Sequence, residues 1–265
     1  MIKNFFLAIL MLLGITALHA QAVDGSGETT ILIPISMLDP VPGAHGTLWK
    51  SELWVHNGLA DSLTLKPCGF ISPLCSLPLH LPGTTEQAFP SETLSQRGSL
   101  LITNIPAALA ADVVLSSRLF ELSRNAQPAG IALPVVREDH FFTKPSRFIA
   151  ISSHPSLRAA IRIYDPSVLG VNDPRMREGR SLRLEVFAPD GRSLGASNAA
   201  LEYRDVQTEA SGFATIYDLA AMFPQVRGVA RYDVRVTPLT PGMVYWAFVS
   251  VTDNDTQQVM LITAD

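Results

Sequence analysis

Residues 181–193 read SLRLEVFAPDGRS, and this stretch decides the class of fold. Apolar and polar side chains alternate from Leu182 to Phe187, which is the period of a strand with one face in the core and one in water. Asp190-Gly191 follows, and Asp-Gly between two such segments is a strong signal for a hairpin turn. The stretch therefore predicts two antiparallel strands joined by a tight turn.

The same alternation recurs elsewhere, for example in ELWVH at 52–56 and RYDVRV at 231–236. The 17 Gly and 19 Pro residues are spread along the chain, and strand-like segments follow one another about every ten residues. Only 106–111 and 216–223 have helical patterns, both too short for the crossover helices of a parallel sheet. We therefore predict an all-β protein of two tandem antiparallel β-sandwich, immunoglobulin-like domains.

An internal repeat sets the expected domain boundaries. Five segments recur in the same order in both halves, and the second copy has an insertion, PSVLGVNDPRMREGR, at 166–180. The matched pairs are ILIPIS (31–36) with FIAIS (148–152), KSELWVHN (50–57) with RAAIRIYD (158–165), LLITN (100–104) with ARYDVRVT (230–237), VVLSSRLF (113–120) with VYWAFVSV (244–251), and GIALPVV (130–136) with QVMLITA (258–264). We expect a first domain over 23–137 and a second over 138–265.

The first 22 residues, MIKNFFLAILMLLGITALHAQA, have the layout of a secretory signal peptide. Lys3 precedes an apolar run that ends at Leu18, and small residues follow, with cleavage expected after Ala22 or Ala20. The alternative is a membrane anchor, but the run is shorter than the roughly 20 residues that span a bilayer. We expect a secreted or periplasmic protein with no membrane span once the signal is removed.

The two cysteines, Cys68 and Cys75, lie in one short stretch, CGFISPLC. Because an exported chain meets an oxidising environment, we predict a disulfide between them. A zinc site would need further ligands and a redox pair would favour C-x-x-C, so both alternatives are weaker.

The order of these segments resembles that of secreted bacterial proteins built from tandem β-sandwich units, a group without a known activity. The likeness rests on the IPIS strand followed by a Trp-containing strand, the LEVFAPDGRSLG hairpin, the Arg-Gly strands and the terminal VSVTDNDTQQVMLI hairpin. It covers nearly all of residues 29–265, although the CGFISPLC loop and the 166–180 insertion depart from it. The resemblance implies fold and export, and it supplies no catalytic residue, cofactor or ligand.

The composition and the motifs argue against nucleic-acid binding, metal or cofactor binding, and catalysis. The net charge is −4, so no nucleic-acid partner is expected. No two histidines have metal-ligand spacing and no G-x-S-x-G motif occurs, so we expect no metal, no cofactor and no enzyme. Two carboxylates that meet only in space would allow a carbohydrate-active enzyme, which stays an alternative. Asp253-Asn254-Asp255 is interpreted as a hairpin turn, and Arg175, Arg177 and Arg180 as part of a solvated loop.

Tryptophans are the remaining candidates for a contact surface. If Leu53 and Val55 face the core, Trp54 is exposed together with Glu52 and His56, and an exposed Trp on a sheet can mark an interface. Trp49 is the second candidate, and Trp246, within a run apolar on both faces, is expected in the core. We predict a non-catalytic binding or adhesion protein for a polysaccharide or protein partner, or alternatively a structural component of the envelope acting by protein–protein contact.

Overall fold

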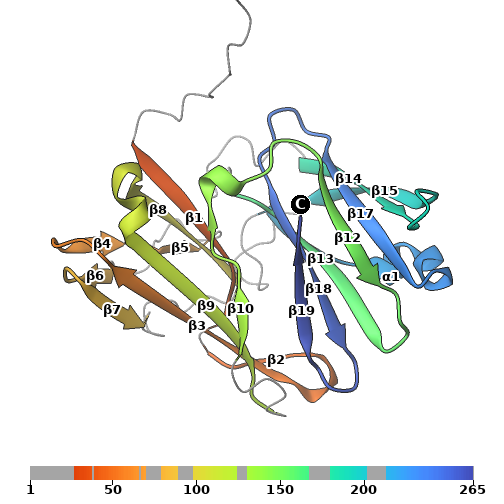
Figure 1. The fold of residues 1–265 in the computed structure, drawn as a ribbon, viewed down its shortest axis with the longest axis horizontal. Helices are drawn as coiled ribbons and strands as arrows, with labels where there is room; N and C mark the ends of the chain where they lie inside the picture. Colours follow the sequence, from red (N-terminus) through yellow and green to blue (C-terminus); the bar gives the residue numbers. More distant parts are fainter. Residues whose placement is uncertain are drawn as a thin grey trace, which may run out of the picture.

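A computed structural model describes residues 27–37, 39–65, 67–69, 79–88, 98–123, 130–166, 180–201 and 213–264 (Figure 1). Within these ranges the protein is all-β with antiparallel strand pairs, as the sequence predicts. The predicted signal peptide at 1–22 and most of the 166–180 insertion lie outside them. No helix in the described ranges is long and apolar enough to cross a membrane.

The first half of the chain forms two main sheets and a small one. One sheet has the order β11-β1-β8-β5, the second has the order β10-β9-β3-β2 with β7 also paired to β3, and β4 pairs with β6. The strands are β1 (Glu28–Ser36), β2 (Val41–Pro42), β3 (Leu48–Asn57), β4 (Leu63–Leu65), β5 (Pro67–Gly69), β6 (Leu79–Leu81), β7 (Thr85–Ala88), β8 (Gly98–Pro106), β9 (Val113–Glu121), β10 (Ile131–Leu133) and β11 (Val136–Arg137).

The second half forms two four-stranded sheets, β12-β17-β14-β15 and β16-β13-β18-β19. The strands are β12 (Ser146–Ser152), β13 (Leu157–Asp165), β14 (Arg180–Phe187), β15 (Ser193–Leu201), β16 (Phe213–Asp218), β17 (Arg231–Pro238), β18 (Trp246–Asp253) and β19 (Val259–Thr263). Short helical turns connect strands in both halves. They include the 3₁₀ turns η1 (Ala44–Gly46), η3 (Ala107–Asp112), η4 (Glu138–His140) and η6 (Pro224–Gly228), and the α-helix α1 (Leu219–Met222).

The five matched segment pairs occupy corresponding places in these sheets. β1 pairs with β8 as β12 pairs with β17, and β3 pairs with β9 as β13 pairs with β18. The path β7-β3-β9-β10 in the first half has its counterpart in β16-β13-β18-β19 in the second. Segments that resemble each other only weakly in sequence thus have the same neighbours.

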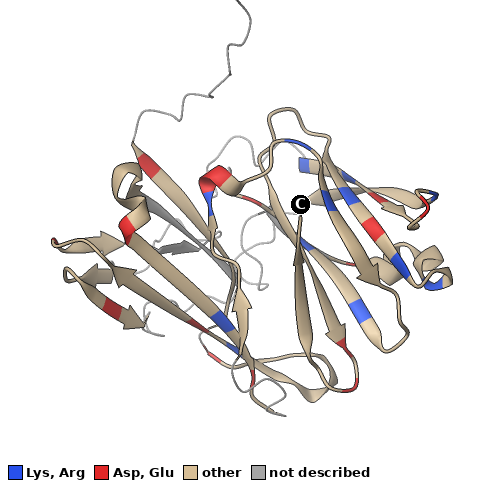
Figure 2. Ribbon diagram, in the orientation of Figure 1, with Lys and Arg blue, Asp and Glu red and all other residues tan. Residues whose placement is uncertain are grey.

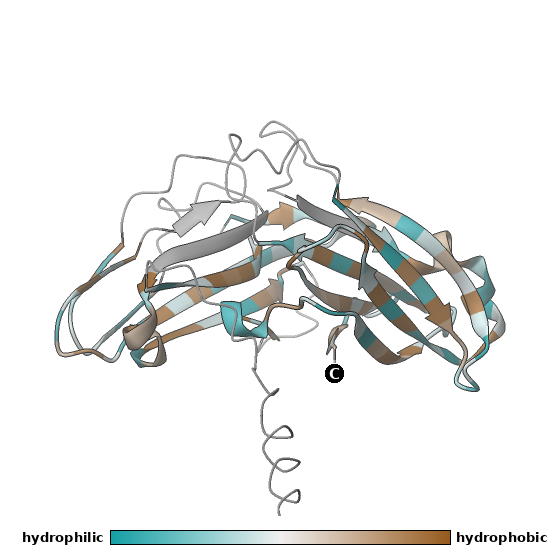
Figure 3. Cartoon of the chain, turned by 90° about the horizontal axis from the view of Figure 1, so that it is seen from above, coloured by the Kyte–Doolittle hydropathy of each residue, from teal (hydrophilic) through white to brown (hydrophobic). Residues whose placement is uncertain are grey.

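The alternation in β14 shows why these segments form strands. Leu182, Leu184 and Val186 are fully buried, while Arg183 is exposed on the other face, and Figure 3 shows the same brown and teal banding on other strands. Gly191 has a φ of 83° in the β14–β15 turn, which glycine adopts without strain. The predicted hairpin is confirmed.

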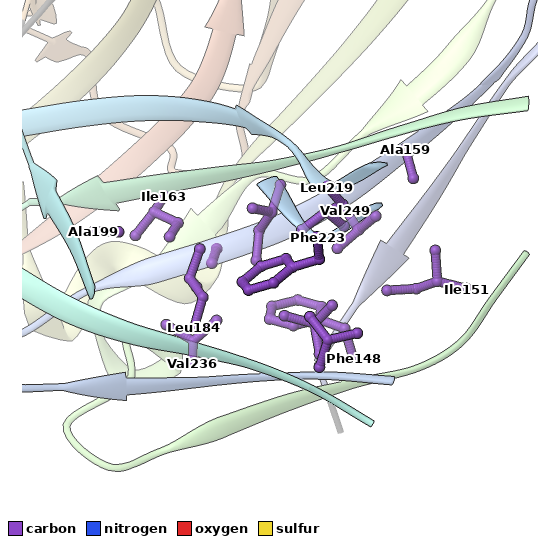
Figure 4. Close-up of a cluster of buried hydrophobic side chains, with 14 of the residues drawn as sticks. Phe148, Ile151, Ala159, Ile163, Leu184, Ala199, Leu219, Phe223, Val236 and Val249 are labelled. Carbon is purple, nitrogen blue, oxygen red and sulfur yellow. The ribbon is translucent and has the colours of Figure 1, made fainter. Parts of the chain in front are cut away.

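Each half has a buried cluster between its own sheets. In the second half, Leu184 and Val236 come from one sheet and Ile163 and Val249 from the other, and their side chains point toward one another (Figure 4). In the first half, Ile33 of β1 and Val55 of β3 belong to a corresponding cluster. Burying these apolar faces is the main favourable contribution to folding.

A third cluster joins the two halves. Leu32 of β1 and Leu119 of β9 pack with Tyr164, Trp246 and Phe248 from the second half. The four larger sheets thus have a propeller-like, four-blade arrangement rather than that of two separate sandwich domains. The prediction of two tandem sandwich domains is corrected here: each half has a core of its own, as expected, but the halves also share this third cluster. Alternation along a strand could not reveal this, because it does not show whether an outer sheet face meets water or another sheet.

Candidate functional site

Trp54 lies on the outer face of β3, as the alternation predicts. Leu53 and Val55 are 2% and 0% exposed, whereas Trp54 is 40% exposed. In the sheet register Trp54 lies between Ala88 of β7 and Ser116 of β9. Because both neighbours have small side chains, the indole is the largest group at the centre of this face.

Polar side chains surround this indole. His56 lies on the same face two residues along β3, between Glu86 and Val114 in the register, and Val114 is 53% exposed. Glu52 lies on the other side of Trp54 along the strand. We call the outer surface of β7, β3 and β9 around Trp54 the Trp54 face; it combines an exposed aromatic ring with a polar surround.

Trp49 is not part of this face. It has the opposite parity along β3, and its indole Nε1 donates a hydrogen bond to Thr47 Oγ1 at 2.8 Å. The ring packs onto Gly43, where an added Cβ would lie 2.6 Å from two atoms of the ring. Trp49 instead lines a cavity between the two halves. The structure therefore does not bring Trp49 and Trp54, the two candidate contact residues, together.

This inter-half cavity has a volume of about 320 Å³. One wall is a single face of the β13-β18-β19 sheet, where Arg158 lies opposite Thr252 and Ala160 opposite Ser250. The other wall comes from the first half and includes Trp49. The cavity thus has a polar, arginine-bearing wall facing a largely apolar one.

Two arginines on that wall, Arg158 and Arg162, have no carboxylate within ion-pair distance in the described part of the chain. Arg158 donates to Asn254 Oδ1 at 2.7 Å and to Gln257 Oε1 at 2.9 Å, both neutral acceptors. Burial lowers the pKa of the Arg158 guanidinium. The Nε of Arg162 is buried and has no hydrogen-bond partner among the described residues.

By contrast, two arginines on the outer face of the β12-β17-β14 sheet form close ion pairs with carboxylates. Arg147 pairs with Asp233 at 2.7 Å and Arg235 with Glu185 at 2.6 Å, so blue and red lie side by side in Figure 2. Pairs this exposed contribute little to stability. Glu185 also lies 3.4 Å from Arg183, so this one carboxylate serves two arginines of the sheet.

A larger cavity of about 680 Å³ lies beside α1 and η6. Tyr232 lines it and is 1% exposed; burial raises the pKa of its hydroxyl, and Asp218 raises it further. Asp218 is the one carboxylate residue among those lining this cavity, and its Oδ1 accepts hydrogen bonds from the backbone of Ala220 and Ala221. The pair of carboxylates that glycoside hydrolysis requires does not occur in this cavity.

Other candidates from the sequence have structural roles or are not described. Asp253 Oδ1 accepts from the backbone N–H groups of Asp255 and Thr256, so the predicted turn is confirmed, and these bonds lower the pKa of Asp253. Among the described residues no three His, Cys, Asp or Glu side chains form a metal site. Cys75 lies outside the described residues, so its disulfide with Cys68 stays a prediction.

The interpretation of the 166–180 insertion as a solvated loop is wrong for its last residue, Arg180. Arg180 was expected in a solvated loop with Arg175 and Arg177, which lie outside the described residues. Instead Arg180 begins β14, is 4% exposed, and its Nε lies 3.2 Å from Oδ2 of the buried Asp165 at the end of β13. The reason is that β14 already begins at Arg180, the last residue of the stretch assigned to the insertion, and the buried carboxylate of Asp165 compensates its charge.

No family model, no curated protein and no solved structure matches this chain.

Proposed function

We propose that this chain is an exported, non-catalytic binding protein that acts in the cell envelope or outside the cell through its Trp54 face. The observation that carries the proposal is the exposed indole of Trp54 at the centre of a sheet face. Large aromatic side chains are enriched at binding surfaces because they supply wide contact area at little entropic cost.

The chemistry of this face favours a polysaccharide. The exposed part of the indole, between the small residues Ala88 and Ser116, can stack on the apolar face of a sugar ring. Glu52, His56 and Glu86 can exchange hydrogen bonds with sugar hydroxyl groups. A protein partner is the alternative outcome of the test below.

The two halves are proposed to be divergent copies of one two-sheet unit, spanning 23–137 and 138–265 after removal of a signal peptide at 1–22. Equivalent strand pairings and a buried cluster between the sheets of each half support this organisation. In this account the Trp54 face belongs to the first copy. The corresponding strand of the second copy, β13, instead turns its outer face toward the first half.

The test is a glycan array probed with wild type, Trp54→Ala and Ile149→Ala. Ile149 is a matched control, since it is 45% exposed but lies on β12 in the other half. Wild type and Ile149→Ala should bind the same glycans, while Trp54→Ala should lose them. Wild type that retains no glycan, or Trp54→Ala that binds as wild type does, would overturn the proposal; a Trp54-dependent protein partner in cross-linking would replace it.

A further inference from the structure

A second feature lies away from the Trp54 face and is independent of it. The inter-half cavity is bounded on one side by Arg158, Ala160 and Arg162 of β13 and on the other by apolar side chains of the first half, among them Trp49 and Leu119. Ala160 separates the two arginines along one strand face, so the floor between them is small and apolar.

The two guanidinium groups differ in their partners. Arg158 is held by Asn254 and Gln257. Arg162 donates a hydrogen bond to the hydroxyl oxygen of Tyr164, whose own proton goes to the carbonyl of Pro34 at 2.8 Å. Among the described residues Arg162 has neither an ion-pair partner nor a hydrogen-bond acceptor for its buried Nε.

A partly buried guanidinium without a counter-charge is unfavourable, because a hydrogen bond to the neutral Tyr164 hydroxyl replaces the lost hydration only in part. A carboxylate is the anion whose planar geometry matches the guanidinium fork. The one carboxylate residue among those lining this cavity, Asp218, caps α1 instead and makes no ion pair with either arginine. Among the described residues, none that lines this cavity thus supplies the negative charge that fits this position.

The opposite wall decides what the rest of the ligand is. The indole N–H of Trp49 is already bonded to Thr47, so the ring offers the cavity only apolar surface, as does Leu119. A volume of about 320 Å³ lies near the lower end of the range of roughly 300–1,000 Å³ for small-molecule sites. An inorganic anion would leave this apolar wall unused.

We propose that the inter-half cavity binds a small amphiphilic carboxylate, with its carboxylate on Arg162 and its hydrocarbon part between Ala160 and the apolar wall that contains Trp49. Arg158 adds to the positive electrostatic potential in the cavity. Because its guanidinium is held by two side-chain amide oxygens, it contributes less to carboxylate binding than Arg162. The ligand contacts both halves and so closes the space between them.

The test uses isothermal titration calorimetry of the purified protein with decanoate, below its micelle concentration, and with decanol. Decanoate should bind wild type at least tenfold more tightly than decanol, the usual size of a hydrogen bond to a charged group. Arg162→Gln should lose that preference, Arg162→Lys should keep part of it, and Arg158→Gln should reduce it less. Arg192→Gln, an exposed arginine on the β14–β15 turn, is the control and should bind as wild type does.

Several results would overturn the proposal. They are the absence of decanoate binding, equal affinity of wild type for decanoate and decanol, and undiminished decanoate affinity in Arg162→Gln. Displacement of decanoate by an equal concentration of inorganic phosphate would show an anion site without recognition of the hydrocarbon part, and would also overturn it. If Arg162→Gln does not fold, the comparison of decanoate with decanol on wild type still decides.

Discussion

Tyr164 is expected to make the stability of the protein depend on alkaline pH. It is 4% exposed, and burial raises the pKa of its hydroxyl to about 12 against the opposing effect of the Arg162 charge. In the unfolded chain the pKa returns to about 10. The unfolded state therefore loses a proton that the folded state keeps, and the free energy of unfolding falls as pH rises above 10.

The size of this loss of stability follows from the difference between the pKa of Tyr164 in the folded and unfolded states. Stability from this group is fully present below pH 10, and it falls by roughly 1 to 1.5 kcal/mol for each pH unit until the folded hydroxyl ionises. Over two units the total is roughly 3 kcal/mol. Tyr164→Phe removes this dependence and also the hydrogen bond to Pro34, which should cost about 1–2 kcal/mol at neutral pH.

The assay is urea denaturation of wild type and Tyr164→Phe at half-unit steps from pH 8 to pH 11.5. Above pH 10 the free energy of unfolding should fall more steeply with pH for wild type than for Tyr164→Phe. The difference between the two slopes should be close to that expected for one tyrosine. Phe248→Leu is the control, because Phe248 stacks on Tyr164 with centroids 6.4 Å apart and does not titrate. It should lose stability yet keep the wild-type slope. Equal slopes for wild type and Tyr164→Phe would refute the argument.

Three further substitutions test the packing. The buried amide of Asn57 donates to three backbone carbonyls, so Asn57→Asp should lower the free energy of unfolding by at least ~3 kcal/mol in chemical denaturation; a loss below 1 kcal/mol would contradict this. Asp165→Ala should cost about 3–5 kcal/mol because it leaves the buried Arg180 charge uncompensated, while the double variant with Arg180→Met should recover part of the loss in the same assay. Phe148→Ala, in the second-half cluster, should cost about 3–5 kcal/mol, and a thermal midpoint equal to that of wild type would argue against the described core.

Much of the fold could be predicted because period-two alternation reports directly on strands. It placed β14, β17 and the exposed Trp54, and the run at 244–251, apolar on both faces, is indeed a central strand. Trp246 packs on the contact between the halves while Val249 packs inside the second half. The short β4, β5 and β6 were not predicted, since three residues are too few for a periodic signal.

The candidate sites were harder to predict. RAAIRIYD carries Arg158 and Arg162 on one strand face, a pattern that in sequence looks like an ordinary solvated face. Only the tertiary contact made through Tyr164 shows that this face meets the other half. Likewise, spacing along β3 could not reveal that Trp49 and Trp54 lie on different features.

The most direct test of binding through the Trp54 face is a pair of depletion isotherms on the polysaccharide that the array identifies. Wild type and Trp54→Ala should both remain folded in the assay, because Trp54 is 40% exposed and lies outside the buried clusters. Their affinities should nevertheless differ by about 30-fold, equivalent to the ~2 kcal/mol of a central aromatic contact. Superimposable isotherms from two folded proteins would contradict the account.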